Sequence, residues 1–123
     1  MNIEELRLFC LALKATDESF PFDDKTLVFK VMNKMFLLCS LEAQPLRFNF
    51  KAKPEDGISY REDYPSVIPG YHSDKKHWNT VSLDGSVPRE ILEKFVLDSY
   101  YLVVAGLPKY KQKELRDNDT QHS

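Results

Sequence analysis

Apolar and polar positions follow two different spacings along the chain, and each spacing predicts a different kind of element. Near the N-terminus the spacing is helical, because one apolar residue recurs every three or four positions. These residues are Ile3, Leu6, Cys10 and Leu13. Asn2 can cap the helix, and Glu4 and Glu5 suit the positive end of its dipole. We therefore predict a helix that starts after Asn2 and ends near the sequence ATDES, before Pro21.

Three strand-like segments follow with no helix between them. In the first segment, 27–31, Leu27, Phe29 and Val31 alternate with Val28 and Lys30. Asn33 and Lys34 are predicted to form a tight turn after it. The second segment, 35–41, is apolar at consecutive positions, which is typical of a strand covered on both faces. The third segment, 46–51, alternates strictly between apolar and polar residues. Three successive strands without a crossover helix predict an antiparallel meander.

The next part of the chain predicts a short helix and one further strand. Pro54 can open the helix and Pro65 must close it, while Gly57 weakens it. The strand is predicted at 77–83, and the dipeptide at 84–85, Asp-Gly, then turns the chain.

A long helix near the C-terminus has a clear apolar stripe. It is predicted to begin at Ser86 or Val87, with Pro88 in its first turn, and to end at Gly106. Its core positions are Ile91, Leu92, Phe95, Val96, Leu102 and Val103. Residues 109–123 have little to bury, and we predict that they form a frayed tail.

This order of elements predicts an α+β fold in which helices pack on an antiparallel sheet as a two-layer sandwich. The 123 residues suit one domain, which we place at 1–108. No apolar run approaches the roughly 20 residues that cross a bilayer, so no membrane association is expected. Glu4 and Glu5 occupy the place of a signal peptide's basic region, and a cytoplasmic location is therefore expected.

The cysteines and the net charge limit which kinds of functional site can be expected. Cys10 and Cys39 lie in apolar segments without a CxxC spacing, which predicts two buried, reduced thiols. The formal net charge is -2, whereas nucleic-acid-binding domains are usually basic as a whole. Nucleic-acid binding would therefore require a local basic patch.

Residues 64–83 contain two histidines, two lysines and the only tryptophan of the chain. His72, Ser73 and Asp74 are the residue types of a nucleophile triad, but adjacent side chains cannot be aimed at one another. The chain has no GxSxG elbow and no glycine-rich phosphate loop, so we expect no enzyme activity and no cofactor. His72, Asp74 and His77 match no zinc spacing, so we expect no metal site.

The same stretch has side chains suited to nucleic acid: lysines for phosphates, an indole for stacking and an amide for a base edge. If Val81 and Leu83 face the core, alternation sends neighbouring side chains to the opposite face. That face would then hold Trp78, Thr80, Lys30, Arg47 and Lys51. A half-buried packing role for Trp78 is the competing interpretation, which the residues alone favour.

Three segments of the chain resemble the MmcQ/YjbR family of small bacterial proteins. They read FPFDDKTLVFKVMNKMFLLCSLE, YPSVIPGYHSDKKHWNTVSLDGSVP and SYYLVVAGLPK. The resemblance implies a frataxin-like (CyaY-like) two-layer fold, with two β-hairpin wings for which the family is described as DNA-binding. By that analogy the wings include the turn at Asn33 and Lys34 and the loop from His72 to Lys76.

The leading hypothesis is therefore a DNA-binding module that contacts mainly the phosphates of double-stranded DNA. Its predicted site residues are Lys34, Arg47, Lys51, His72, Lys75, Lys76, His77, Trp78 and Asn79. The alternative is a protein-interaction or regulatory domain in which Tyr64, Tyr71 and Trp78 anchor a protein partner. Frataxin-like handling of ferrous iron is a third hypothesis, implied by the fold resemblance alone.

Overall fold

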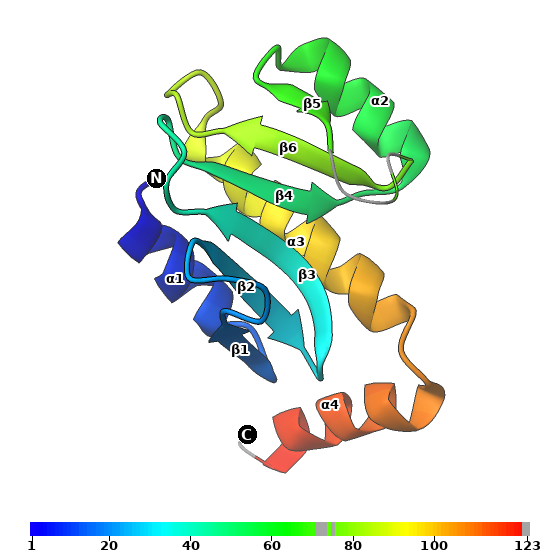
Figure 1. The fold of residues 1–123 in the computed structure, drawn as a ribbon. Coiled ribbons are helices and arrows are strands. Elements are labelled where there is room, and N and C mark those ends of the chain that lie inside the picture. Colours follow the sequence, from blue (N-terminus) through cyan, green and yellow to red (C-terminus); the bar gives the residue numbers. More distant parts are fainter. Residues whose placement is uncertain (71–73, 75, 122–123) are drawn as a thin grey trace.

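The computed structural model contains one antiparallel sheet with helices along one side of it (Figure 1). It describes residues 1–70, 74 and 76–121. In chain order the elements are α1 (Ile3–Leu11), β1 (Thr16–Ser19), β2 (Thr26–Val31), β3 (Lys34–Ser40), β4 (Arg47–Lys51), α2 (Pro54–Asp63), β5 (Val67–Pro69), β6 (Trp78–Ser82), α3 (Arg89–Ala105) and α4 (Lys109–Gln121). The predicted α+β class is confirmed.

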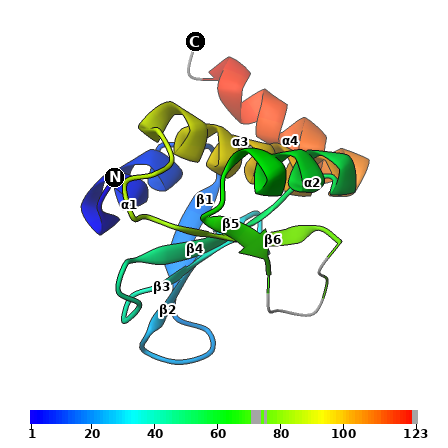
Figure 2. The same ribbon diagram turned by 90° about the horizontal axis from the view of Figure 1, so that it is seen from above.

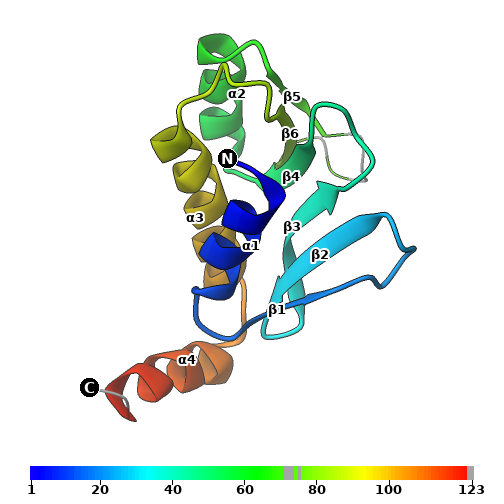
Figure 3. The same ribbon diagram turned by 90° about the vertical axis from the view of Figure 1, so that its left-hand side faces the viewer.

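The six strands lie in the order β1-β2-β3-β4-β6-β5, and every neighbouring pair is antiparallel. The predicted meander is confirmed, and it has four strands because β1 precedes the three that the sequence indicated. All four helices lie on one side of the sheet, and no helix of the described chain covers the other side (Figure 2). The loop between β1 and β2 projects on that uncovered side (Figures 2 and 3). We call this side the open face.

The first helix starts as predicted and ends earlier than predicted. The Asn2 side chain accepts a hydrogen bond from the Glu5 amide (2.9 Å), and the Glu5 carboxylate accepts one from the Asn2 amide (3.0 Å). This reciprocal pair is a capping box. The helix ends at Leu11, and Ala15 then takes a left-handed conformation with φ of 56°. The prediction of helix close to ATDES was therefore wrong, because Thr16–Ser19 pairs with β2 instead.

The turn between β2 and β3 lies one residue earlier than predicted. Met32 and Asn33 have φ values of 46° and 71°, and Lys34 is already the first residue of β3. The pairing register shifts after Phe29, so that Phe36 has no opposite residue on β2. This bulge explains part of the apolar run in β3, because the consecutive residues Phe36 and Leu37 both join the core under the helices.

Aromatic packing joins α3 and α2 to the sheet. The ring of Phe95 stacks on Phe50 of β4, with 4.5 Å between centroids and 4° between planes. Tyr60 of α2 lies 4.7 Å from the same Phe95 ring. A buried hydroxyl adds a polar connection: Ser99 of α3 accepts from the Lys51 amide (2.8 Å) and donates to the Phe36 carbonyl. Since α3 provides both contacts, it fixes β3 and β4 together.

The C-terminal segment corrects a second prediction. Residues 109–123 were expected to fray, but the chain is helical from Lys109 to Gln121 as α4. Leu115 is buried, and the Gln112 side chain donates hydrogen bonds to the Leu107 carbonyl (2.8 Å) and the Ala105 carbonyl (3.3 Å). One apolar contact and one side-chain clamp therefore hold a segment whose composition is otherwise polar. The helix before it, α3, begins at Arg89 and has Pro88 as its N-cap, slightly later than predicted.

The two thiols are buried and free, as predicted. Burial raises the pKa of the Cys39 thiol to about 12 and also raises the pKa of the Cys10 thiol. Within the described residues, no helix is both long enough and apolar enough to cross a membrane.

Candidate nucleic-acid interface

The register of the strands decides which side chains share the open face. Trp78 pairs with Lys51, and Thr80 pairs with Asn49, which in turn pairs with Leu38. Paired residues point to the same side of a sheet. The Thr80 hydroxyl donates to the Asn49 side-chain oxygen, which shows that both side chains lie on that side. The predicted placement of Trp78 and Lys51 away from the helices therefore agrees with the structure.

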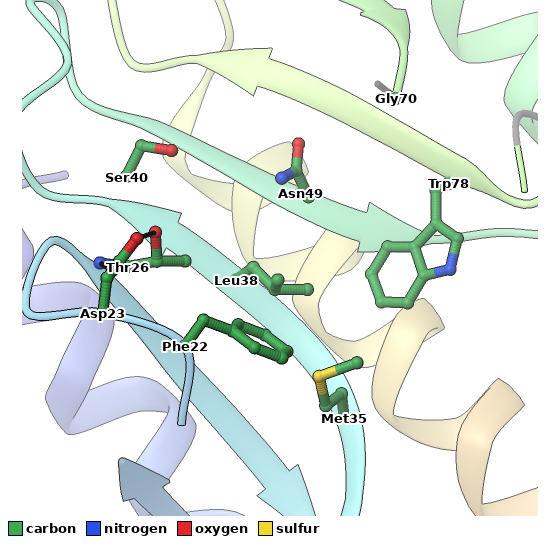
Figure 4. A pocket seen from close by; sticks show the side chains of 9 residues that line it. All are labelled: Phe22, Asp23, Thr26, Met35, Leu38, Ser40, Asn49, Gly70 and Trp78. Carbon is green, nitrogen blue, oxygen red and sulfur yellow. Dashed lines mark hydrogen bonds between the residues drawn. The ribbon is translucent and has the colours of Figure 1, made fainter. Parts of the chain in front are cut away.

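A hollow of about 390 Å³ lies on the open face. Its lining residues are Phe22, Asp23, Thr26, Met35, Leu38, Ser40, Asn49, Gly70 and Trp78. Leu38 lies in the middle, with the ring of Phe22 and the indole of Trp78 on two adjacent sides of it (Figure 4). Asp23, Thr26 and Ser40 lie at the end away from Trp78 (Figure 4). The hollow therefore has an aromatic, apolar end and a polar end.

Asp23 both shapes the loop and supplies the charge at the polar end of the hollow. One carboxylate oxygen accepts hydrogen bonds from the amides of Lys25 (2.9 Å) and Thr26 (2.8 Å). These two bonds hold the pKa of Asp23 below its ordinary value, so the group is ionised near neutral pH. The same bonds close the turn that brings the neighbouring Phe22 over the sheet.

Two predicted lysines meet the tryptophan in a second hollow. This hollow of about 340 Å³ is lined by Lys34, Lys51, Met35, Trp78 and the C-terminal end of α3. The Lys51 ammonium lies 5.9 Å from the centre of the Trp78 ring, within the range of a cation–π contact. Met35 and Trp78 line both hollows, so the two adjoin there. The structure thus brings together Lys34, Lys51 and Trp78.

The segment before β6 holds a histidine–carboxylate pair. Nδ1 of His77 lies 2.6 Å from Oδ2 of Asp74, and the Lys76 amide donates to Oδ1 of the same carboxylate (3.1 Å). The His77 contact is the largest cause of the lowered pKa of Asp74. Asp74 thereby binds one ring nitrogen of His77. The Lys76 side chain is exposed to solvent.

The remaining predicted residues fall into three groups. Arg47 is exposed and begins β4, at the opposite end of that strand from Lys51, and lines neither hollow. Asn79 is fully buried, and its side-chain oxygen accepts a hydrogen bond from Arg61 of α2 (2.5 Å). It therefore lies under the helices, and its predicted contact with nucleic acid was wrong. His72 and Lys75 lie outside the described residues, as does Tyr71.

Most of the residues that line the first hollow were not predicted from the sequence as site residues. These are Phe22, Asp23, Thr26, Met35, Leu38, Ser40, Asn49 and Gly70. One signal was available for Phe22, an aromatic residue in a polar turn segment outside any periodic pattern. It is 63% exposed.

Gly70 lies where the chain must approach Trp78 closely. Its amide donates to the Trp78 carbonyl (2.8 Å), and a Cβ atom here would lie 3.0 Å from three Trp78 atoms, two of them backbone. We expect Gly70→Ala to lower the free energy of unfolding by about 1–3 kcal/mol, because the edge of the sheet must shift. Urea denaturation monitored by circular dichroism measures this loss.

Gly106→Ala is the matched control for the Gly70 variant. A Cβ at Gly106 would meet its nearest atom, the Val103 carbonyl oxygen, at an ordinary 3.5 Å. Its φ of -87° suits alanine, so the change is expected to be neutral or stabilising by up to about 1 kcal/mol. Equal losses in both variants would contradict the proposed role of the close approach at Gly70.

Charge is distributed unevenly between the two layers. The helices contain twelve acidic and eight basic residues, a net charge of -4, whereas the six strands contain four basic residues and two acidic ones, both in β1, a net charge of +2. The four basic residues are Lys30, Lys34, Arg47 and Lys51. The overall charge of -2 therefore does not describe the strands, which are the more basic of the two layers. Among the described residues, no group of three or more His, Cys, Asp or Glu side chains could hold a metal ion.

The fold and this surface define a small α+β domain in which the helices of the described chain all lie on one side of an antiparallel sheet. A family model described as YjbR matches residues 11–102. The chain is 36% identical to the Uncharacterized protein YbdF of Escherichia coli O157:H7, over 92% of this chain and 93% of that one. It is 33% identical to the Uncharacterized protein YjbR of Escherichia coli K12, over 94% and 98% of the two chains. The chain belongs to the YjbR family.

Solved structures agree with this assignment. The crystal structure of Deinococcus radiodurans protein DR2400 superposes with a TM-score of 0.86 at 46% identity, over 93% of this chain and 87% of that one. A Pseudomonas syringae protein superposes with a TM-score of 0.71 at 22% identity, over 83% and 98% of the two chains. The second likeness supports the fold alone.

Proposed function

We propose that this chain is a non-catalytic nucleic-acid-binding module that contacts phosphates through Lys34 and Lys51, at the end of the sheet near α3, and bases through Trp78. The observation that carries the proposal is the second hollow, which Lys34 and Lys51 line together with the half-buried Trp78. No ion pair involves either lysine among the described residues, so both ammonium groups are available to phosphates. Lys76 and Arg47 add two exposed cations at the margins of the open face.

A basic cleft with an aromatic side chain is typical of surfaces that follow a nucleic-acid backbone and stack on its bases. Each lysine that contacts a phosphate releases condensed counterions, so the affinity must fall as salt rises. The test is fluorescence anisotropy with a labelled single strand and a labelled duplex, at low salt and near physiological salt. Binding that weakens with salt supports the proposal. Absence of binding to both probes at low salt would overturn it.

The double variant Lys34→Ala/Lys51→Ala is expected to weaken binding to all sequences about equally. For a single strand, each lost phosphate contact flattens the slope of log K against log salt by about 0.7, so the pair should remove about 1.4. Anisotropy titrations at four or more salt concentrations measure this slope.

Lys109→Ala/Lys113→Ala removes the same charge from exposed positions on α4 and is the matched control. Its slope should stay at the wild-type value if the second hollow, rather than the total charge, binds the phosphates. Equal flattening in the two double variants would argue for nonspecific attraction to the whole protein.

A protein partner is the second candidate function. The observation in its favour is the exposed apolar surface beside Trp78, since Phe22 is 63% and Ile68 is 36% exposed. Binding of that kind would depend on apolar burial and would change little with salt. The anisotropy experiment separates the two candidates, because only nucleic acid gives a steep salt dependence.

A further inference from the structure

We propose that the hollow between Phe22 and Trp78 holds one unpaired base, so that the chain binds single strands in preference to duplexes. This inference rests on the proposed function and specifies the ligand of the same site. The volume of about 390 Å³ lies within the range of roughly 300–1,000 Å³ that is usual for small-molecule sites. The rings of Phe22 and Trp78, which both lie beside Leu38, provide stacking surfaces for a flat ring (Figure 4).

The polar end of the hollow suits the hydrogen-bonding edge of a base. Asn49 uses its side-chain oxygen to accept from Thr80, and its amide nitrogen donates to no group among the described residues. The Ser40 hydroxyl likewise has no hydrogen bond within the described part of the chain. Asp23 supplies ionised acceptor oxygens beside them. Donors and acceptors thus line one end, and a base edge carries both.

An apolar side chain of a protein partner would match this hollow less well. It would cover Asp23, Asn49 and Ser40 without forming hydrogen bonds to them. Polar groups that are desolvated without a partner weaken binding, and an ionised carboxylate does so most. A base that stacks on one of the rings can cover the apolar end while its polar edge bonds to the other end.

The lysines lie where the backbone of the same nucleotide would leave the hollow. Met35 and Trp78 form the boundary between the first hollow, which would hold the base, and the second hollow, which Lys34 and Lys51 line. The Asp23 carboxylate lies at the opposite end, where it does not oppose a phosphate (Figure 4). Base, sugar and phosphate would therefore follow one path from the polar end to the lysines. A base inside a duplex is stacked and paired on its own strand, so it cannot enter without being extruded.

The test uses Trp78, the only tryptophan of the chain, as the reporter. An unlabelled 12-nucleotide single strand and a hairpin duplex of the same sequence are titrated into the protein, and tryptophan fluorescence is recorded with labelled-probe anisotropy in parallel. We expect quenching by the single strand, with at least about tenfold tighter binding than the duplex, because only an unpaired base can stack on the aromatic rings. Equal affinity for both probes without quenching would overturn the inference.

Phe22→Ala removes one wall of the hollow at a position that is 63% exposed. It should weaken single-strand binding about 5- to 150-fold and leave the salt slope unchanged, since it removes stacking and no charge. Phe20→Ala is the matched control: Phe20 is 49% exposed in the same loop but lines a different hollow, beside α1. Equal effects of the two variants would overturn the assignment of the hollow.

The outcomes separate the inference from the function on which it rests. Salt-dependent binding that is lost in Lys34→Ala/Lys51→Ala, but unaffected by Phe22→Ala, would preserve the proposed function and overturn the base-binding hollow. Absence of binding to both probes at low salt would overturn both, and would leave the hollow to a protein partner.

Discussion

Replacing Phe95 by alanine is expected to lower the free energy of unfolding by about 3–5 kcal/mol. The ring is fully buried, stacks on Phe50 at 4.5 Å and lies 4.7 Å from Tyr60. Its removal leaves a cavity at the point where α3 meets β4 and α2, and aromatic contacts are lost together with buried area. Since a domain of this size has only about 5–15 kcal/mol of stability, the loss is severe.

Urea denaturation followed by circular dichroism measures the change at Phe95. The matched control is Phe22→Ala, the same truncation at a 63% exposed position, which should stay within about 0.5 kcal/mol of the wild type. A cost below about 1.5 kcal/mol for Phe95→Ala would show that neighbouring side chains collapse into the cavity. The ring would then not be the principal contact between the layers.

Ser99→Ala is expected to cost about 2–4 kcal/mol, a large effect for the loss of one oxygen atom. The hydroxyl is fully buried, accepts from the Lys51 amide (2.8 Å) and donates to the Phe36 carbonyl. Phe36 is the extra residue of the bulge, so its carbonyl lies outside the regular pairing with β2. The variant leaves both backbone groups buried without this partner, at about 1–3 kcal/mol each.

The matched control for Ser99→Ala is Ser59→Ala, at an exposed position of α2. This change should be neutral or slightly stabilising, because alanine is the better helix former. Amide hydrogen exchange adds a local readout: the Lys51 amide should lose protection in the Ser99 variant before the rest of β4 does. Retained protection at Lys51 would contradict the role given to the hydroxyl.

Strong periodic patterns predicted the centre of the fold, and weak ones missed its edges. The alternation of 46–51 and the predicted cap at Asn2 were sufficient to place β4 and the start of α1. The edge strands β1 and β5 have four and three residues, too few to show a period, and their pairing partners define them. The helix α4 depends on one buried leucine and a side-chain clamp, which polar composition does not reveal.

The candidate site was predictable only where it follows a single strand. Alternation placed Trp78 on the open face, and the same rule requires the adjacent Asn79 to point to the helices, where Arg61 binds it. The hollow itself combines side chains from five separate segments, joined by strand register. Register depends on turns and bulges, and the turn at Met32 was misplaced by one residue. Local pattern therefore could not locate the hollow.

The uneven distribution of charge between the layers has a consequence for the encounter with a ligand. The strands carry a net charge of +2 (four basic and two acidic residues) and the helices one of -4 (eight basic and twelve acidic), which gives the molecule an electric dipole moment across its thickness. A polyanion that approaches the helical side is repelled and one that approaches the sheet is attracted, so the field turns the protein before contact. A protein of nearly neutral charge can thereby gain association rate from orientation alone, an advantage that disappears as salt shortens the screening length.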